Sequence, residues 1–207
     1  AGSVSLVGLG DDVTLSAENL SVEINQASGT DSSGNPATAV IDFAAFDFEV
    51  ITGPEDSMTF DMPGDAGALL RASGDLNINL FGFFQVSGGF AFEKSTRSVR
   101  VDGESENIDV DTMTLGASGV DPFAGINGGT DEALGLELTD VNFALALMSP
   151  KAVEGQPADA RSWTALKATA GSVSLVGLGD DVTLSAENLT VEINQASGTD
   201  SSGNPAT

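Results

Sequence analysis

The chain begins and ends with almost the same 38 residues. Residues 1–38 read AGSVSLVGLGDDVTLSAENLSVEINQASGTDSSGNPAT, and the string returns at 170–207 with one change, from Ser21 to Thr190. The period is therefore 169 residues, so the chain holds one full repeat unit, 1–169, and the start of the next identical repeat, 170–207. Identity this high indicates recent duplication. We expect the chain to be a window of a longer tandem array.

A weaker repetition lies inside the period. Four stretches show apolar alternation, then Ser or Thr, a short polar gap and renewed alternation. Their anchors are Ser16, Ser87, Thr139 and Ser185. The pattern predicts about three related β sub-modules per unit, although amphipathic strands also resemble one another without common origin.

Apolar and polar residues alternate through most of the chain, which is the two-residue period of a β-strand. No segment shows a strong helical period, and the stretch after Pro157 is predicted to be mainly strand. The predicted apolar sets are Phe46, Phe48 and Val50, expected to point inward; Leu76, Ile78 and Leu80; and Phe90 and Phe92.

Two polar interruptions break the first run of alternation. Gly10-Asp11-Asp12 is predicted to be a hairpin turn, because Gly tolerates positive φ and Asp hydrogen-bonds its own backbone. Ala17-Glu18-Asn19 is predicted to be a turn or a bulge. Short strands and 25 glycines favour an all-β class.

The expected architecture is an elongated tandem-repeat array of mostly antiparallel sheets. A sandwich and a solenoid both remain open, although unequal spacings disfavour a regular parallel β-helix. We expect sheets to continue from one repeat into the next, because continuation hides edges that would otherwise promote aggregation.

The charge of the chain restricts its partners. Seven Lys and Arg accompany 31 Asp and Glu, which gives a formal net charge of −24. Nucleic acid and anionic membrane surfaces are disfavoured, because both need clustered cations. No apolar run approaches the ~20 residues of a membrane helix, so no membrane insertion is expected. The acidic residues either form a solvated surface or bind divalent cations.

Catalytic signals are weak. The chain has no His and no Cys, so it lacks the usual base and the thiol nucleophile. We expect no enzymatic activity, and an enzyme acting on polysaccharide is the least favoured function.

One loop has the composition of a calcium site. Calcium prefers several oxygen ligands from Gly-containing loops, and DGESENIDVD supplies five carboxylates. The EF-hand spacing is absent, and acidic turns facing water are the simpler interpretation. The candidate ligands are Asp102, Glu104, Glu106, Asp109 and Asp111.

The segments LKATAGSVSLVGL, VTLSAENLTVEIN and FGFFQVSGGFAFEKS together resemble tandem modules of very large bacterial surface and secreted proteins. The resemblance covers most of the 169-residue unit and implies arrays of acidic, cysteine-free β domains. It implies a stalk, fibre or adhesin-like role and transfers no functional residue.

These observations predict a structural repeat of a large extracellular or cell-surface polymer. Its partners are expected to be adjacent copies of the same repeat, joined by continuity of strands and sheets. The alternative is a calcium-dependent adhesive or glycan-binding module that contacts a glycan or a cell surface. No cofactor is required by the first hypothesis, and Ca²⁺ is required by the second.

Overall fold

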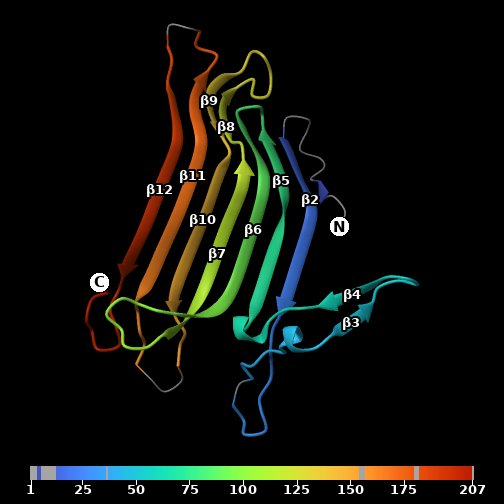
Figure 1. Cartoon of the computed structure of the whole chain (residues 1–207), viewed down its shortest axis with the longest axis vertical. Coiled ribbons are helices and arrows are strands. Elements are labelled where there is room, and N and C mark those ends of the chain that lie inside the picture. The colour runs from blue at the N-terminus through green and yellow to red at the C-terminus, as the bar shows by residue number, and fades with distance from the viewer. Residues whose placement is uncertain (1–3, 6–12, 36, 154–156, 180–181, 207) are drawn as a thin grey trace.

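The computed structural model describes residues 4–5, 13–35, 37–153, 157–179 and 182–206. These residues form a ten-stranded antiparallel sheet and a separate two-stranded sheet (Figure 1). The all-β, mostly antiparallel class is thus confirmed. The main sheet contains β1 (Val4–Ser5), β2 (Val13–Asn25), β5 (Leu69–Leu80), β6 (Phe84–Val99), β7 (Ile108–Val120), β8 (Phe123–Ile126), β9 (Leu134–Thr139), β10 (Val141–Pro150), β11 (Ser162–Val176) and β12 (Ser185–Ser197).

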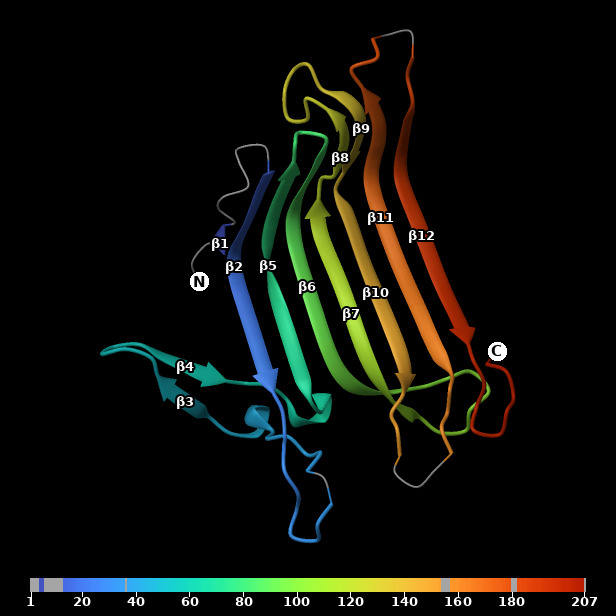
Figure 2. The same ribbon diagram turned by 180° about the vertical axis from the view of Figure 1, so that it is seen from behind.

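The main sheet is a meander when β7 with β8, and β9 with β10, are each treated as one interrupted strand. β7 and β8 follow one another with a break at Asp121-Pro122, and β9 and β10 do so with a break at Asp140. β8 pairs with β9 and β7 pairs with β10, so the four segments form one long, interrupted hairpin between β6 and β11. Figure 2 shows the same succession from behind. The stretch after Pro157 contributes β11, as predicted.

A line of irregular residues crosses the sheet. Four residues with left-handed backbone lie along it, and Asn, Asp and Gly tolerate this conformation better than other residues. We call this set the bulge line: Asn19 (φ 52°), Gly119 (φ 57°), Asp140 (φ 49°) and Asn188 (φ 54°).

The bulge in β2 keeps its apolar residues on one side of the sheet. The register towards β5 shifts between Glu18 and Ser21, where Asn19 and Leu20 face Gly74 alone. One extra residue compensates for the polar interruption in the sequence, so the alternation resumes on the same face. The prediction of a turn or bulge at Ala17-Glu18-Asn19 is therefore resolved as a bulge. The turn predicted at Gly10-Asp11-Asp12 lies outside the described residues.

The four Ser or Thr anchors all lie close to the bulge line. They belong to β2, β6, β9 and β12, which run in the same direction because they alternate with antiparallel neighbours. The sheet therefore places the weak internal repetition on every second strand of the meander.

The two faces of the sheet differ in chemistry between the bulge line and the end of the sheet where Asn25 pairs with Leu69, which we call the foot of the sheet. Registers and strand alternation define an apolar face and a polar face. The apolar face has three rows: Leu20, Gly74, Phe90, Ala117, Phe143, Ala168 and Val191; Val22, Ala72, Phe92, Leu115, Leu145, Leu166 and Ile193; and Ile24, Leu70, Lys94, Met113, Leu147, Thr164 and Gln195. The polar face includes Glu23, Arg71, Glu93 and Lys167.

The two side chains that are fully buried in the described part of the chain lie at the foot of the polar face. Leu69 and Val110 are fully buried there, and Thr112 and Met62 are nearly so. The chain between β2 and β5 reaches this region, since Asn25 Nδ2 donates to the Ile41 carbonyl at 2.7 Å. The loop between β6 and β7 lies at the feet of β10 and β11 (Figure 1). Two irregular connections thus build the small core.

The apolar face remains open to solvent. Val22 is 65 % exposed, Val191 52 % and Met113 43 %. The accessible surface is 13645 Å², whereas a compact protein of 20.9 kDa exposes roughly 9,000 Å². The described residues form one main layer, and no second sheet packs on it as a sandwich would require.

The two-stranded sheet joins β3 (Phe48–Ile51) to β4 (Ser57–Phe60) and projects past the β2 edge (Figure 1). Phe43 packs edge-on against Phe60, with ring centroids 5.2 Å apart. The expectation that Phe46, Phe48 and Val50 point inward is wrong: they are 50, 42 and 37 % exposed. A lone hairpin has too little neighbouring surface to bury both strands.

Candidate assembly interface

The repeated segment supplies strands at both edges of the main sheet. β2 lies at one edge, with only β1 outside it among the described residues, and β12 lies at the other. Six antiparallel pairings separate β2 from β12, so the two strands point the same way (Figure 1). A copy of the sheet shifted by six strands would therefore place β2 where β12 lies.

The pairing at the two edges has the same register. β1 pairs with β2 through Val4↔Ala17 and Ser5↔Ser16. β11 pairs with β12 through the equivalent residues 169 positions later, Val173↔Ala186 and Ser174↔Ser185. β1 is thus the counterpart of the last part of β11.

Each edge of the main sheet has a strand flank without a described partner, and the equivalent flank is paired at the other edge. The outer flank of β2 past Ala17 has no partner among the described residues, whereas the same flank of β12 pairs with β11 as far as Ser197. Conversely, β12 has no described partner on its outer flank, whereas β2 pairs there with β5 from Val13 to Asn25. The β2 edge therefore shows how one flank of the repeated strand is paired, and the β12 edge shows how its other flank is paired.

Two equivalent glycines show the missing neighbour directly. Gly29 and Gly198 have nearly the same backbone, with φ of 94° and 87°. A Cβ on Gly198 would come within 2.0 Å of the Ala160 carbonyl oxygen, whereas a Cβ on Gly29 would meet nothing within 4 Å. The space beside Gly29 is equivalent to the space beside Gly198 that the segment leading into β11 occupies, at Ala160.

A repeated glutamate forms a different ion pair in each copy. Glu23 accepts from Arg71 of β5 at 2.8 Å, and its equivalent Glu192 accepts from Lys167 of β11 at 2.8 Å. The hydrogen bond that Lys167 donates to Glu192 lowers the pKa of Glu192 and raises the pKa of Lys167. A carboxylate has two acceptor oxygens, so one glutamate can bind both cations when both flanks are occupied.

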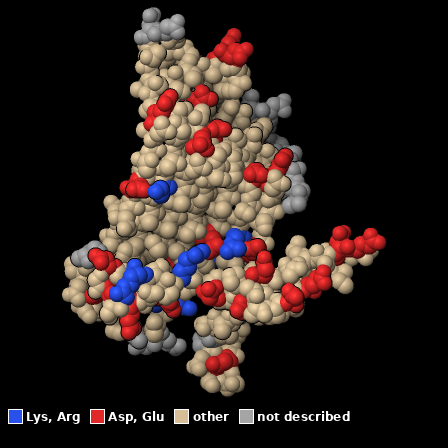
Figure 3. Space-filling model, viewed as in Figure 1, with Lys and Arg blue, Asp and Glu red and all other residues tan. Residues whose placement is uncertain are grey.

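The ion pairs continue along the polar face from Arg71. Glu93 accepts from Arg71 at 2.9 Å and from Arg97 at 2.7 Å. Burial raises the pKa of Glu93, but hydrogen bonds from Arg97, Ser95 and Arg71 outweigh it and hold the pKa below its usual value. Figure 3 shows most of the cations of this face in its lower half, next to acidic residues.

The turn after each repeated strand is also the same in both copies. Asp31 Oδ1 accepts from the backbone N–H of Ser33 at 2.8 Å and of Asn35 at 2.9 Å. Asp200 makes the equivalent bonds, at 2.8 Å each. The backbone N–H of Asn35 lowers the pKa of Asp31, and the Asn204 side chain does most to lower that of Asp200. The repeated segment carries its local structure with it.

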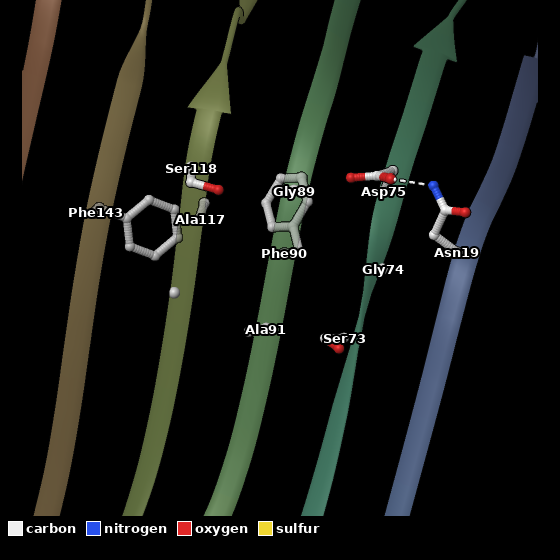
Figure 4. A pocket seen from close by; sticks show the side chains of 11 residues that line it. Asn19, Ser73, Gly74, Asp75, Gly89, Phe90, Ala91, Ala117, Ser118 and Phe143 are labelled. Carbon is white, nitrogen blue, oxygen red and sulfur yellow. Dashed lines mark hydrogen bonds between the residues drawn. The ribbon is translucent and has the colours of Figure 1, made fainter.

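A shallow depression of about 490 Å³ lies at the bulge line. Figure 4 shows Phe90 and Phe143 on either side of Ala117, while Asn19 donates to Asp75 at 2.7 Å. The lining consists of glycine, alanine, serine and aromatic side chains with one amide and one carboxylate. This set offers a packing surface and no nucleophile paired with a base.

The candidate calcium ligands are spread over the loop and the start of β7. Glu104 accepts from Arg161 at 2.6 Å, and Asp111 accepts from Thr96 Oγ1 at 3.2 Å. Asp102 and Glu106 lie in the loop, and Asp109 in the strand. Within the described residues, no three acidic side chains are grouped as a metal ion requires. Calcium binding stays a prediction.

Reasoning from the sequence missed the residues that define the interface. Gly198, Glu192 and Lys167 belong to no recognisable motif. The one signal in the sequence is that Gly198 and Glu192 have counterparts 169 residues earlier, Gly29 and Glu23. Neither of the two three-residue 3₁₀ helices in the described part of the chain could span a membrane. Comparison with protein-family models, curated proteins and solved structures found no match.

Proposed function

We propose that the chain is part of a structural polymer whose tandem repeats share one continuous antiparallel sheet. The observation that carries this proposal is the equivalence of the two edges. β2 and β12 match in sequence except at Ser21 and Thr190, run in the same direction, and pair with β1 and β11 in the same register. In the polymer, β12 is the β2 strand of the next repeat and pairs with the next β5.

The ion pairs support the same arrangement. In a continuous sheet each copy of Glu23 lies between Lys167 of the preceding repeat and Arg71 of its own. Both pairs already occur in the chain at 2.8 Å, one at each edge. The junction would therefore add no unpaired charge to the polar face.

We place this polymer outside the cell or on its surface, as a stalk, fibre or adhesin-like filament. Its acidic, cysteine-free composition and its resemblance to modules of giant bacterial surface proteins support this role. The function is then mechanical: the repeats provide length and display, and adjacent copies are the main partners.

The experiment compares residues 1–169 with residues 1–207. Without 170–207, β11 ends at Thr169, β9 loses its β11 partner, and the flank of Ser162–Thr169 that pairs with β12 is bare. The matching segment then available is residues 1–38 of another molecule, which contains β1 and β2. We expect 1–169 to form head-to-tail oligomers with rising concentration, measured by sedimentation velocity, and 1–207 to do so far less. A synthetic peptide of residues 170–207 should dissociate the oligomers by capping β11. A 1–169 chain that stays monomeric and as stable as 1–207 would end the proposal.

A further inference from the structure

The apolar face is a second uncovered surface, separate from the two edges. We propose that it packs against the same face of a second copy of this chain, so that two sheets form a two-layer ribbon with their polar faces outward. This inference concerns the face of the sheet and holds with or without the tandem array.

The area of the face is sufficient for a stable dimer. Seven strands at ~4.8 Å spacing and three rows that span about six residues at ~3.3 Å give a footprint of roughly 670 Å² per copy. Two copies would cover about 1,300 Å², within the range of about 1,200–2,000 Å² for specific interfaces. The chain's surface of 13645 Å² exceeds the compact value by roughly 4,600 Å², so the area is available.

The shape of the face suits another sheet. Along the row next to the bulge line, large and small side chains alternate: Leu20, Gly74, Phe90, Ala117, Phe143 and Ala168. A hollow of about 260 Å³ lies at Ala72 and Gly74. Large side chains of one copy can enter the hollows of the other, as in packed sheets ~10 Å apart. Binding to a lipid surface would require only apolar side chains and would not require large and small side chains to alternate.

The charges favour the same occupant. In the three rows of the apolar face, Lys94 is the single charged residue. The ion pairs of Glu23, Arg71 and Glu93 lie on the opposite face and would stay in water. Face-to-face packing therefore brings no carboxylates together, whereas an anionic lipid surface would repel a chain with a net charge of −24.

The test uses the 207-residue chain and two variants of adjacent residues on β10. Leu145 lies on the apolar face and Ala144 on the polar face, beside Lys167. In sedimentation velocity at physiological salt, we expect dimers for the unmodified chain and for Ala144→Glu. Leu145→Glu should weaken the dimer at least a hundredfold while circular dichroism shows the fold intact. A dimer through the sheet edges would survive Leu145→Glu, and that result would overturn the proposal.

Thiol labelling gives a second measurement that needs no charged substitution. The chain has no Cys, so Ala72→Cys and Ser73→Cys place single thiols on opposite faces of β5. As concentration rises, maleimide labelling of Ala72→Cys should slow at least tenfold, and that of Ser73→Cys should not change. Equal rates would overturn the proposal. An unmodified chain that is monomeric at every concentration would also overturn the proposal, whether or not it floats with phosphatidylcholine vesicles.

Discussion

Gly29 and Gly198 allow a test at the scale of single residues, because they share sequence and backbone and differ only in their surroundings. Both have positive φ, so alanine at either position introduces backbone strain of roughly 1–2 kcal/mol. Only at Gly198 would the new Cβ also meet the Ala160 carbonyl oxygen. We expect Gly198→Ala to lower the free energy of unfolding by about 2–4 kcal/mol and Gly29→Ala by about 1 kcal/mol, measured by urea unfolding.

The same pair distinguishes a local effect from an assembly effect. In the 1–169 chain, Gly29→Ala should reduce oligomer formation, because it places a methyl group where the preceding repeat would pair. The unmodified 1–169 chain is the control. Equal losses of stability for the two alanine variants would contradict the structural difference between the edges.

Asp159 gives a prediction for the acid limb of the stability curve. The Arg161 guanidinium bonds it at 2.7 Å and lowers its pKa, so the folded pKa lies below the unfolded value near 4. Its stabilisation is complete above about pH 4 and is lost as the pH falls towards the lowered folded pKa. We expect Asp159→Asn to cost roughly 1 kcal/mol at pH 7 and much less at pH 2, measured by thermal unfolding. A loss that is the same at both pH values would contradict the ion pair.

At the scale of the strand, the bulge at Asn188 connects sequence to the faces of the sheet. A φ of 54° is tolerated by Asn and Gly, whereas β-branched residues avoid it. We expect Asn188→Val to destabilise the chain by about 1–2 kcal/mol and Asn188→Gly by a few tenths, from chemical unfolding. Similar losses for the two variants would show that the left-handed backbone is not maintained in solution.

The strands themselves could be predicted from the sequence. The alternation of Leu76, Ile78 and Leu80 with asparagines defined β5, and Phe90 and Phe92 defined part of β6. Even the interruption at Ala17-Glu18-Asn19 was predicted as a turn or bulge, because local polarity reports local geometry.

The position of the core could not be predicted in this way. Alternation shows which side chains share a face, but it does not show what covers the face. Leu69 and Val110 are buried by irregular connections on the polar side, while Val22 and Val191 remain exposed. The interface residues were missed for a related reason, because Glu192 and Gly198 acquire their roles only from strands distant in sequence.

At the scale of the whole molecule, the calcium hypothesis predicts that calcium stabilises the fold, whereas the arrangement of the acidic side chains predicts no such effect. Glu104 is engaged by Arg161 and Asp111 by Thr96, and the described acidic groups do not gather around one point. We therefore expect the melting temperature to be the same in calcium and in EDTA, measured by differential scanning calorimetry. A rise of several degrees with calcium, absent in a Glu106→Gln and Asp109→Asn double variant, would favour the adhesive alternative instead.

The continuous-sheet proposal also fixes a length. Six strand-to-strand steps lead from β2 to β12, and at ~4.8 Å per step one repeat advances about 29 Å along the sheet. The row that starts at Glu23 ends at Asn194, the equivalent of Asn25, so the strands also shift by two residues, or about 7 Å, per repeat. Electron micrographs of assembled 1–169 should therefore show an axial repeat near 29 Å, reduced slightly by sheet twist. Discrete repeat-sized beads joined by visible linkers would mean that each 169-residue unit closes on itself, because a shared sheet leaves no gap between neighbours.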